Sequence, residues 1–269
     1  MIIISEKLNS SIPSSLKMME NGTDEELRQF ISMQCESGAM YLDLNAAMCS
    51  DEIKTAKRIA DIIIDVGECG IAVDSPSESA MEEILAHING RCDVLINSIT
   101  TTERSGNIDL AVKYGAGIIA VLTDNSGTPE TAEDRLKNAD LVISRLREAG
   151  IEDEKIYIDV IAESSAVSDI AAKVALQTVR MIREKYENVH ITCGLSNISF
   201  GLPERKVFCM DKKKNGFASG IGFVLSAAGS AVGLALFERL HIRISIPELL
   251  LYFGFVLLVG LRLLFHRVL

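Results

Sequence analysis

Five short apolar runs of the chain each end in an aspartate or an asparagine. The runs lie at residues 41–45, 71–74, 94–97, 156–159 and 190–197. Their last residues are Asn45, Asp74, Asn97, Asp159 and Asn197, and Asp43 lies inside the first run. A carboxylate accepts two parallel hydrogen bonds at once, and an amide both donates and accepts. Such groups, delivered to one place by rigid strands, would hold a single ligand through several hydrogen bonds.

The apolar runs are typical of buried strands, and amphipathic segments lie between them. We expect strands at residues 2–4, 40–44, 70–73, 93–96, 117–122, 156–158 and 190–193. Helices are expected at residues 24–37, 51–66, 77–88, 107–114, 132–149 and 168–186. Strands that alternate with helices predict a parallel sheet. Seven such units, about 30 residues apart, favour a TIM (β/α)8-type barrel, whose active sites lie at the carboxyl ends of the strands.

An open dinucleotide-binding sheet is the less favoured alternative. It would carry a glycine-rich turn after its first strand. Here residues 5–9 read Ser-Glu-Lys-Leu-Asn, without a glycine, and are expected to form the first loop. Each strand-end aspartate also has an ordinary explanation, because such residues commonly cap the next helix or bind a loop amide. It is their recurrence at one rim that favours a binding site.

Composition excludes some functions and sets the expected compartment. The chain has 269 residues, 48% of them hydrophobic, and a net charge of -10, which argues against a nucleic-acid partner. Its six cysteines form no Cys-x-x-Cys pair, and no histidine stands at metal-ligand spacing. Scattered cysteines predict reduced thiols in a cytoplasmic protein, without a metal site. The first residues are too short and too soon acidic for a signal peptide.

The strand–helix alternation breaks after Lys206. Residues 215–237 carry no charge, and a second apolar run covers residues 249–261. A bilayer-spanning helix needs about 20 apolar residues. We therefore expect a barrel domain at residues 1–206, truncated after its seventh strand, and an atypical apolar, helical tail at residues 207–269. The tail is interpreted as a transmembrane or re-entrant hairpin, as a substitute for the last barrel units, or as a reading-frame or assembly fault.

Seven short motifs occur in a fixed order along the first 206 residues. They are Glu6-Lys7-Leu8-Asn9, Leu42-Asp43-Leu44-Asn45, Val73-Asp74-Ser75, Ile96-Asn97-Ser98, Asp134-Arg135-Leu136, Tyr157-Ile158-Asp159 and Gly194-Leu195-Ser196-Asn197-Ile198-Ser199. Together they resemble the pterin-binding methyltransferases. That family includes methyltetrahydrofolate:corrinoid methyltransferases and the folate domain of cobalamin-dependent methionine synthase. The chain departs from the family at Ser5 and Lys7, where a Gly and an Arg are usual, and after Lys206.

The resemblance implies a TIM barrel that binds the pterin ring of a folate at its C-terminal rim. Asp159 would accept hydrogen bonds from the 2-amino and ring N–H groups of the pterin, and Asn197 would approach its N5 atom. The other implied pterin contacts are Asp74, Asn97 and Ser98, and the implied supporting residues are Glu6, Asn9, Asp43 and Asn45. The implied catalytic pair is Asn197 with Asp74 as the proton source.

The activity implied is methyl transfer between N5 of methyltetrahydrofolate and the cobalt of a corrinoid. A tertiary amine is a poor leaving group, so N5 needs a proton or a strong hydrogen bond as the bond to the methyl group breaks. The chain has no corrinoid-binding motif, so a partner protein would supply the cobalamin. The resemblance also implies a homodimer without a metal in the barrel, cytoplasmic unless the tail associates with a membrane.

Two other functions stay open. A dihydropteroate synthase shares the pterin barrel, but that family carries a Ser-Arg-Lys type motif after its seventh strand, whereas Ser196 here is followed by Asn197. The third hypothesis is a non-catalytic pterin-binding remnant tethered to a membrane, which the missing eighth unit favours.

Overall fold

The computed structural model describes residues 2–164, 168, 170–194 and 197. The chain divides into two units, residues 1–162 with 177–194 and residues 163–176 with 195–269. All the described strands belong to the first unit. The predicted tail at residues 207–269 lies outside the described residues, so its membrane and domain assignments stay predictions. Within the described part, no helix combines the length and the apolar character that crossing a membrane requires.

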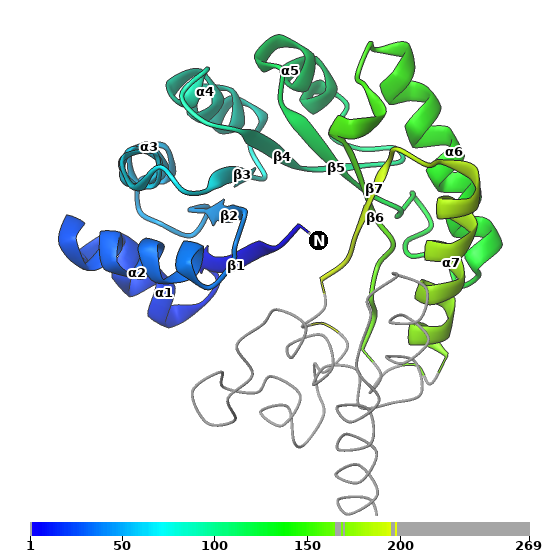
Figure 1. Ribbon diagram of the computed structural model, residues 1–269, viewed down its shortest axis with the longest axis horizontal. Coiled ribbons are helices and arrows are strands. Elements are labelled where there is room, and N and C mark those ends of the chain that lie inside the picture. Colours follow the sequence, from blue (N-terminus) through cyan, green and yellow to red (C-terminus); the bar gives the residue numbers. More distant parts are fainter. Residues whose placement is uncertain (1, 165–167, 169, 195–196, 198–269) are drawn as a thin grey trace, which may run out of the picture. The chain divides into compact units, whose positions relative to one another are not determined.

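The described strands form one parallel sheet of seven, and each strand pairs with the next along the chain. They are β1 (Ile4–Asn9), β2 (Tyr41–Asn45), β3 (Gly70–Asp74), β4 (Val94–Thr100), β5 (Gly117–Val121), β6 (Ile156–Asp159) and β7 (His190–Thr192). Figure 1 shows the strands curling around a common centre, with helices on the outer side. This sequential, curled arrangement confirms the predicted TIM-type fold.

Helices connect the strands, and polar side chains cap several of them. They are α1 (Pro13–Asn21), α2 (Asp24–Glu36), α3 (Glu52–Val66), α4 (Glu78–Ile88), α5 (Gly106–Tyr114), α6 (Ala132–Glu148) and α7 (Ala171–Lys185), with the 3-10 turn η1 (Asp153–Lys155) before β6. Thr23 and Glu26 form a reciprocal capping box at the start of α2. Asp51, Ser77 and Thr131 accept a hydrogen bond from the first turns of α3, α4 and α6. These caps satisfy backbone N–H groups that have no partner within the helix.

Two predictions at the amino-terminal end were wrong. The first strand covers Ile4–Asn9 rather than residues 2–4, so residues 5–9 are strand and not loop. They pair with β2 across a bulge between Ser5 and Leu8, so inter-strand hydrogen bonding continues through a polar stretch. The helix α1 was not predicted. It begins with Pro13 but has no side-chain cap, so its start lacks the capping signal that marks α2 in the sequence.

The inner face of the sheet changes from apolar to polar over two residues. Its apolar layer contains Ala72, Leu95, Ile119 and Tyr157, with Ile2, Ile4 and Tyr41 packed against it. Side chains two positions apart on a strand point to the same face. Asp43, Asp74, Asn97 and Asp159 each follow a member of this apolar layer by two positions. The sheet therefore directs these groups inward, directly above a hydrophobic floor.

The cysteine prediction needs a correction. Cys35, at the end of α2, and Cys69, just before β3, form a disulfide with a Cα–Cα distance of 6.1 Å. The two residues lie 34 positions apart in sequence, and the packing of α2 on α3 brings Cys35 close to Cys69, which follows α3. Cys49, Cys92 and Cys193 are free thiols.

Candidate functional site

Two hydrogen bonds join the polar groups at the inner rim of the sheet. The Asn45 amide donates from Nδ2 to Oδ2 of Asp74 at 2.7 Å. The Asn97 amide donates from Nδ2 to Oδ1 of Asp43 at 3.0 Å. Asp43 belongs to β2 and Asn97 to β4, which are not neighbours in the sheet. The second bond therefore passes over β3 and shows that these side chains converge on one place.

Asn45 supports its neighbours with both ends of its amide. Its Oδ1 accepts hydrogen bonds from Ser10 Oγ at 3.1 Å and from the Ala47 N–H at 3.2 Å. The Ser10 hydroxyl in turn accepts from the Met48 N–H at 2.9 Å. The loops after β1 and β2 are thereby tied to each other and to Asp74. Asn45 is an orienting residue, and the Asp74 carboxylate is the group it presents.

Asp159 ends β6 under a different constraint. Its Oδ1 accepts a hydrogen bond from the Ile161 N–H at 2.8 Å. Glu6 and Arg135 both act on this carboxylate electrostatically, from β1 and from α6. Asp159 and Glu6 act in the same way on the Cys193 thiol, whose pKa is raised to about 11 by desolvation first and by these two charges second. Asp159, Glu6 and Cys193 thus belong to one electrostatic cluster.

The buried acids of the rim all have raised pKa values. The pKa of Asp43 is raised to about 7, first by desolvation and then by the nearby Asp74 and Glu6 charges, despite the bond from Asn97. Desolvation likewise raises the pKa of Asp159 to about 6. For Asp74, desolvation again dominates over the bond from Asn45 and the charge of Arg104. Crowding of like charges away from water favours protonated forms, so this rim can both hold and release protons near neutral pH.

Glu6 completes the acidic cluster from β1. Its side chain is exposed by surface area, yet the surrounding rim desolvates the carboxylate and raises its pKa. The Asp74 charge adds to this effect, and Lys7 opposes it. Glu6 in turn raises the pKa of Asp43 on β2 and of Asp159 on β6, so its charge acts on both of these carboxylates.

The remaining predicted residues have more local surroundings. Asn9 Oδ1 accepts from the Ser11 N–H at 2.8 Å, which is the ordinary turn contact of such a residue. The Ser98 carbonyl accepts from Asn107 Nδ2 at 3.0 Å, and the Asn97–Ser98 peptide is cis. Asn197 is exposed and belongs to the second unit, so its role stays a prediction. Ser196 lies outside the described residues.

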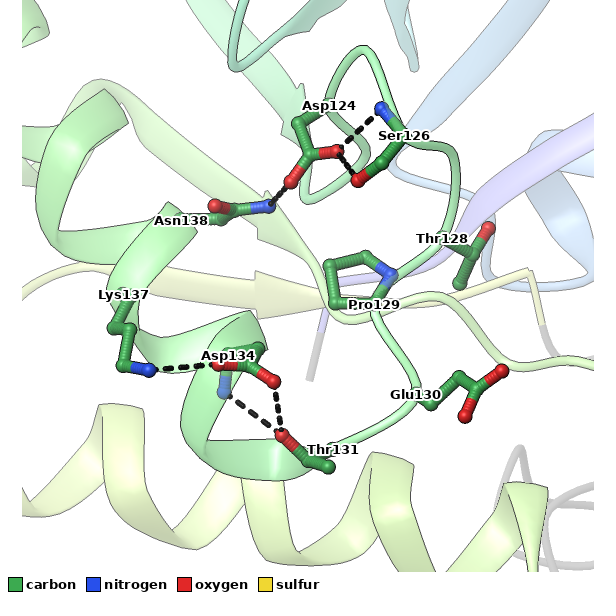
Figure 2. Close-up of a pocket in the computed structure, with 9 residues that line it drawn as sticks. All are labelled: Asp124, Ser126, Thr128, Pro129, Glu130, Thr131, Asp134, Lys137 and Asn138. Carbon is green, nitrogen blue, oxygen red and sulfur yellow. Dashed lines mark hydrogen bonds and ion pairs between the residues drawn. The ribbon is translucent and has the colours of Figure 1, made fainter.

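A hollow of about 460 Å³ lies in the loop between β5 and α6 (Figure 2). Its polar groups serve the loop itself. Asp124 accepts from the Ser126 N–H at 2.8 Å and from Asn138 Nδ2 at 3.0 Å. Thr131 caps α6 through Asp134. The hollow is therefore explained by turn and cap chemistry, and the sequence did not predict it.

The candidate site does not include a metal centre in the part of the chain that is described. There, no group of three or more His, Cys, Asp or Glu side chains could hold a metal ion. The rim instead offers carboxylates, amides and an apolar floor, which suit a flat heterocycle with several N–H donors.

The fold is that of the pterin-binding enzymes. The model of that family matches residues 6–232, and the chain belongs to the family. Over 214 residues it is 31% identical to the methylcorrinoid:tetrahydrofolate methyltransferase of Eubacterium limosum, which covers 77% of this chain and 78% of that protein. It is 28% identical to the methionine synthase of Mycobacterium tuberculosis over 182 residues, 63% of this chain but only 15% of that longer protein. The predicted family resemblance is confirmed.

Solved structures support the same fold. A dihydropteroate synthase of Yersinia pestis has a TM-score of 0.56 with this chain at 14% identity, over 86% of this chain and 85% of that one. A dihydropteroate synthase of Xanthomonas albilineans has a TM-score of 0.52 at 15% identity, over 72% of each chain. At such low identities the likeness shows the fold alone.

Proposed function

We propose that this protein transfers a methyl group between N5 of methyltetrahydrofolate and the cobalt of a corrinoid. The observation that carries the proposal is the converging tier of Asp43, Asn45, Asp74 and Asn97, with Asp159 in the same acidic cluster. The relative from Eubacterium limosum, named for methyl transfer between a methylcorrinoid and tetrahydrofolate, supports the reaction type.

In this proposal the pterin lies on the apolar floor and bonds with the polar tier. Asp159 accepts the 2-amino and ring N–H groups. Because Asn97 donates its Nδ2 to Asp43, it presents its Oδ1 as an acceptor to the ligand. Asp74, oriented by Asn45, is the second carboxylate contact, and Ser98 borders the ring beside Asn97. Binding of N–H donors by an ionised carboxylate is among the strong hydrogen bonds available in proteins.

The methyl transfer itself requires help at N5. Cobalt(I) attacks the methyl carbon, the C–N5 electron pair stays on nitrogen, and N5 takes up a proton or a strong hydrogen bond. Asn197 is proposed to donate a bond that strengthens as N5 gains electron density. Asp74 is proposed to supply the proton, directly or through water. Its raised pKa supports this role, because it keeps a proton to higher pH than an exposed aspartate does.

The corrinoid is proposed to come from a separate partner protein, as a substrate carried to the rim. We also propose that the protein acts as a homodimer in the cytoplasm, with membrane association through residues 207–269. The methyl group can move in either direction, because an enzyme accelerates a reaction and its reverse alike.

The test uses the full chain under anaerobic conditions with free cob(I)alamin and methyltetrahydrofolate. We expect the absorbance of methylcobalamin to appear with the wild type and to be lost in Asn197→Ala. His87→Ala, a change on the outer helices, is the matched control and should turn over normally. Binding of the folate without turnover would replace the proposal with a non-catalytic pterin-binding protein. Formation of dihydropteroate from a pterin pyrophosphate and 4-aminobenzoate would replace it with the synthase.

A further inference from the structure

Arg135 is a fully buried cation, with 0% of its side chain exposed. Its Nη1 donates to the carbonyl oxygens of Val160 and Ile161, each at 2.7 Å, and its Nε donates to the carbonyl of Pro129 at 2.9 Å. An arginine stays charged in proteins, and burying it is unfavourable unless hydrogen bonds replace its water. A guanidinium buried to this degree indicates that the backbone it contacts depends on its hydrogen bonds.

The backbone held by Arg135 is the segment that follows Asp159. Ile161 has a φ of 58°, which is strained for a β-branched residue. From that position its N–H donates to Asp159 Oδ1 at 2.8 Å. The hydrogen bonding between β6 and β7 ends at Val160, whose N–H donates to the Thr192 carbonyl at 3.2 Å. The Arg135 contacts lie at the carbonyls on both sides of the strained residue's N–H, where they can maintain this conformation.

We propose that Arg135 is a positioning residue, which fixes the backbone of Val160 and Ile161 so that the Ile161 N–H orients the Asp159 carboxylate. Arg135 acts through Asp159 and does not touch the substrate. What Asp159 then binds rests on the function proposed above, but the positioning itself does not.

A merely structural role for Arg135 would have different consequences. Loss of a buried cation would then lower the stability of the protein and remove only the direct charge effect of Arg135 on Asp159, so that Arg135→Lys, which keeps the charge, would leave the ionisation of Asp159 unchanged. Among the described residues, three groups act on that carboxylate: the Ile161 N–H, Glu6 from β1 and Arg135 from α6. The Asp159 charge in turn acts on the Cys193 thiol after β7. The Ile161 N–H and Arg135 favour its charged form, whereas Glu6 opposes it. Removing Arg135 should therefore raise the pKa of Asp159 further.

The test titrates the full chain, labelled with ¹³C at the aspartate carboxyl carbons, by NMR. The Asp159 signal is assigned by its loss in Asp159→Asn, and its midpoint is expected at about 6 in the wild type. Arg135→Met should raise this midpoint by about half a unit or more. Asn138→Ala is the matched control, because Asn138 is buried on the same helix but donates to Leu122 and Asp124 instead. That control should leave the midpoint unchanged.

A second readout is the affinity for methyltetrahydrofolate in a double-mutant cycle. Arg135→Met should weaken binding by about tenfold in the wild type but by less than about twofold in the Asp159→Asn background. Arg135→Lys is the deciding variant in both readouts and also serves if Arg135→Met does not fold. A lysine keeps the charge but cannot hold all three carbonyls in the same planar geometry, so a raised midpoint in this variant comes from lost positioning. An unchanged midpoint in a folded variant, or additive effects on affinity, would overturn the inference. Absence of folate binding by the wild type would overturn the proposed function instead, while the titration still decides the role of Arg135.

Discussion

The acids of the inner rim and those of the outer helices respond to folding in opposite ways. At the rim, desolvation raises the pKa of Asp43, Asp74 and Asp159. On the helices, slight burial works against the ionisation of Asp61, but hydrogen bonds from Arg91 and His87 outweigh it and lower the pKa. An aspartate is thus destabilised as an anion at the inner rim and stabilised as an anion on the outer helices. The difference depends on the cations and the water around it.

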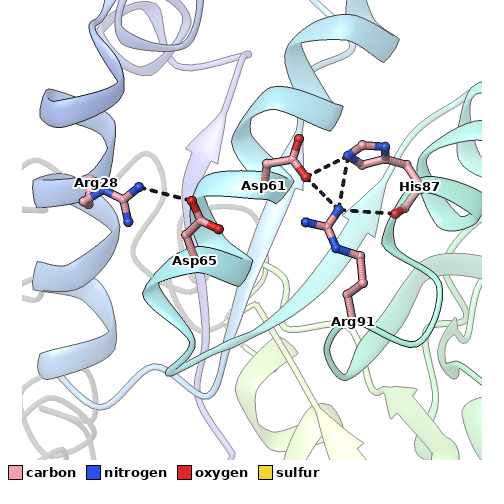
Figure 3. Close-up of polar contacts among 5 residues, drawn as sticks. All are labelled: Arg28, Asp61, Asp65, His87 and Arg91. Carbon is pink, nitrogen blue, oxygen red and sulfur yellow. Dashed lines mark hydrogen bonds and ion pairs between the residues drawn. The ribbon is translucent and has the colours of Figure 1, made fainter.

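Figure 3 shows how the outer acids are paired. Asp61 of α3 contacts His87 at 2.9 Å and Arg91 at 2.7 Å, and Asp65 contacts Arg28 of α2 at 3.3 Å. These pairs join α2, α3 and the end of α4 at the surface. The rim acids have amides and backbone N–H groups as their nearest partners instead. Proteins accept such unfavourable burial mainly where a ligand will use it, which is why the difference points to the rim as the site.

The largest expected effect separates the role proposed for Asp159 from the role proposed for Asn197. Asp159→Ala should weaken folate binding by about 100-fold, because two charge-assisted hydrogen bonds are lost. Asn197→Ala should reduce the rate of methyl transfer by at least a similar factor while keeping much of the affinity, because its bond strengthens only in the transition state. Calorimetric binding and the methylcobalamin assay measure the two properties. Equal losses of both in both variants would contradict this division of roles.

The next prediction concerns the pH dependence of protein stability that the rim residue Asp43 causes. The pKa of Asp43 is about 7 in the folded protein and near 3.8 in the unfolded chain. Between these values the folded state binds more protons, so stability falls as pH rises from about 4 through about 7. Asp43→Asn keeps an acceptor for Asn97 and removes this loss. It should therefore stabilise the protein at pH 8, on the order of 2 kcal/mol, and have little effect at pH 4.

Denaturant unfolding at the two pH values checks the Asp43 prediction. Asn138→Ala serves as a control for general damage to the core, since it should lower stability at both pH values alike. A destabilised Asp43→Asn protein at pH 8 would show that the buried carboxylate supports the fold rather than the ligand.

A smaller effect tests Asn45, the residue that orients Asp74. Asn45→Ala removes the bond that lowers the pKa of Asp74, so that pKa should rise further. Folate affinity should fall by about tenfold, the worth of one hydrogen bond to a charged group. Ser10→Ala removes a contact to the far side of the same amide and the acceptor of the Met48 N–H, and it should have less effect. A Ser10→Ala loss as large as that of Asn45→Ala would assign the effect to the loops rather than to Asp74.

The smallest effect is expected on the outer helices. Asp61 has a lowered pKa, so its contribution to stability is present at neutral pH and is lost as pH falls through the acid range. Its side chain is 45% exposed. Asp61→Asn should therefore cost less than about 1 kcal/mol, and about 1 M salt should remove most of the difference. A salt-independent loss as large as the Asp43 effect would erase the contrast between the two regions.

Much of the rim was predictable because strand-end residues depend on a local pattern. Asp43, Asp74, Asn97 and Asp159 each end or adjoin an apolar run of alternating direction, and the sheet aligns such residues automatically. The hydrogen bond between Asp43 and Asn97 was not predictable, because it joins β2 and β4 across the intervening strand β3. The Cys35–Cys69 disulfide was missed because it depends on the packing of α2 on α3, which no local pattern of the sequence reveals.

Arg135 belongs to one of the sequence motifs but was not predicted to be a functional residue. On a predicted amphipathic helix an arginine is normally a surface residue. Here its partners include backbone carbonyls of Pro129, just before the helix, and of Val160 and Ile161, far away in sequence. Backbone acceptors leave no residue type for a sequence pattern to detect. The first strand was misplaced because its polar residues pair through the main chain alone.

The most direct test of the whole account is calorimetric titration of the purified chain with methyltetrahydrofolate as pH is lowered. We predict saturable binding at pH 7.5 that weakens as pH falls through about 6, where Asp159 takes up a proton, and that Asp159→Asn largely removes. No binding at pH 7.5, or binding by Asp159→Asn as tight as by the wild type, would contradict it.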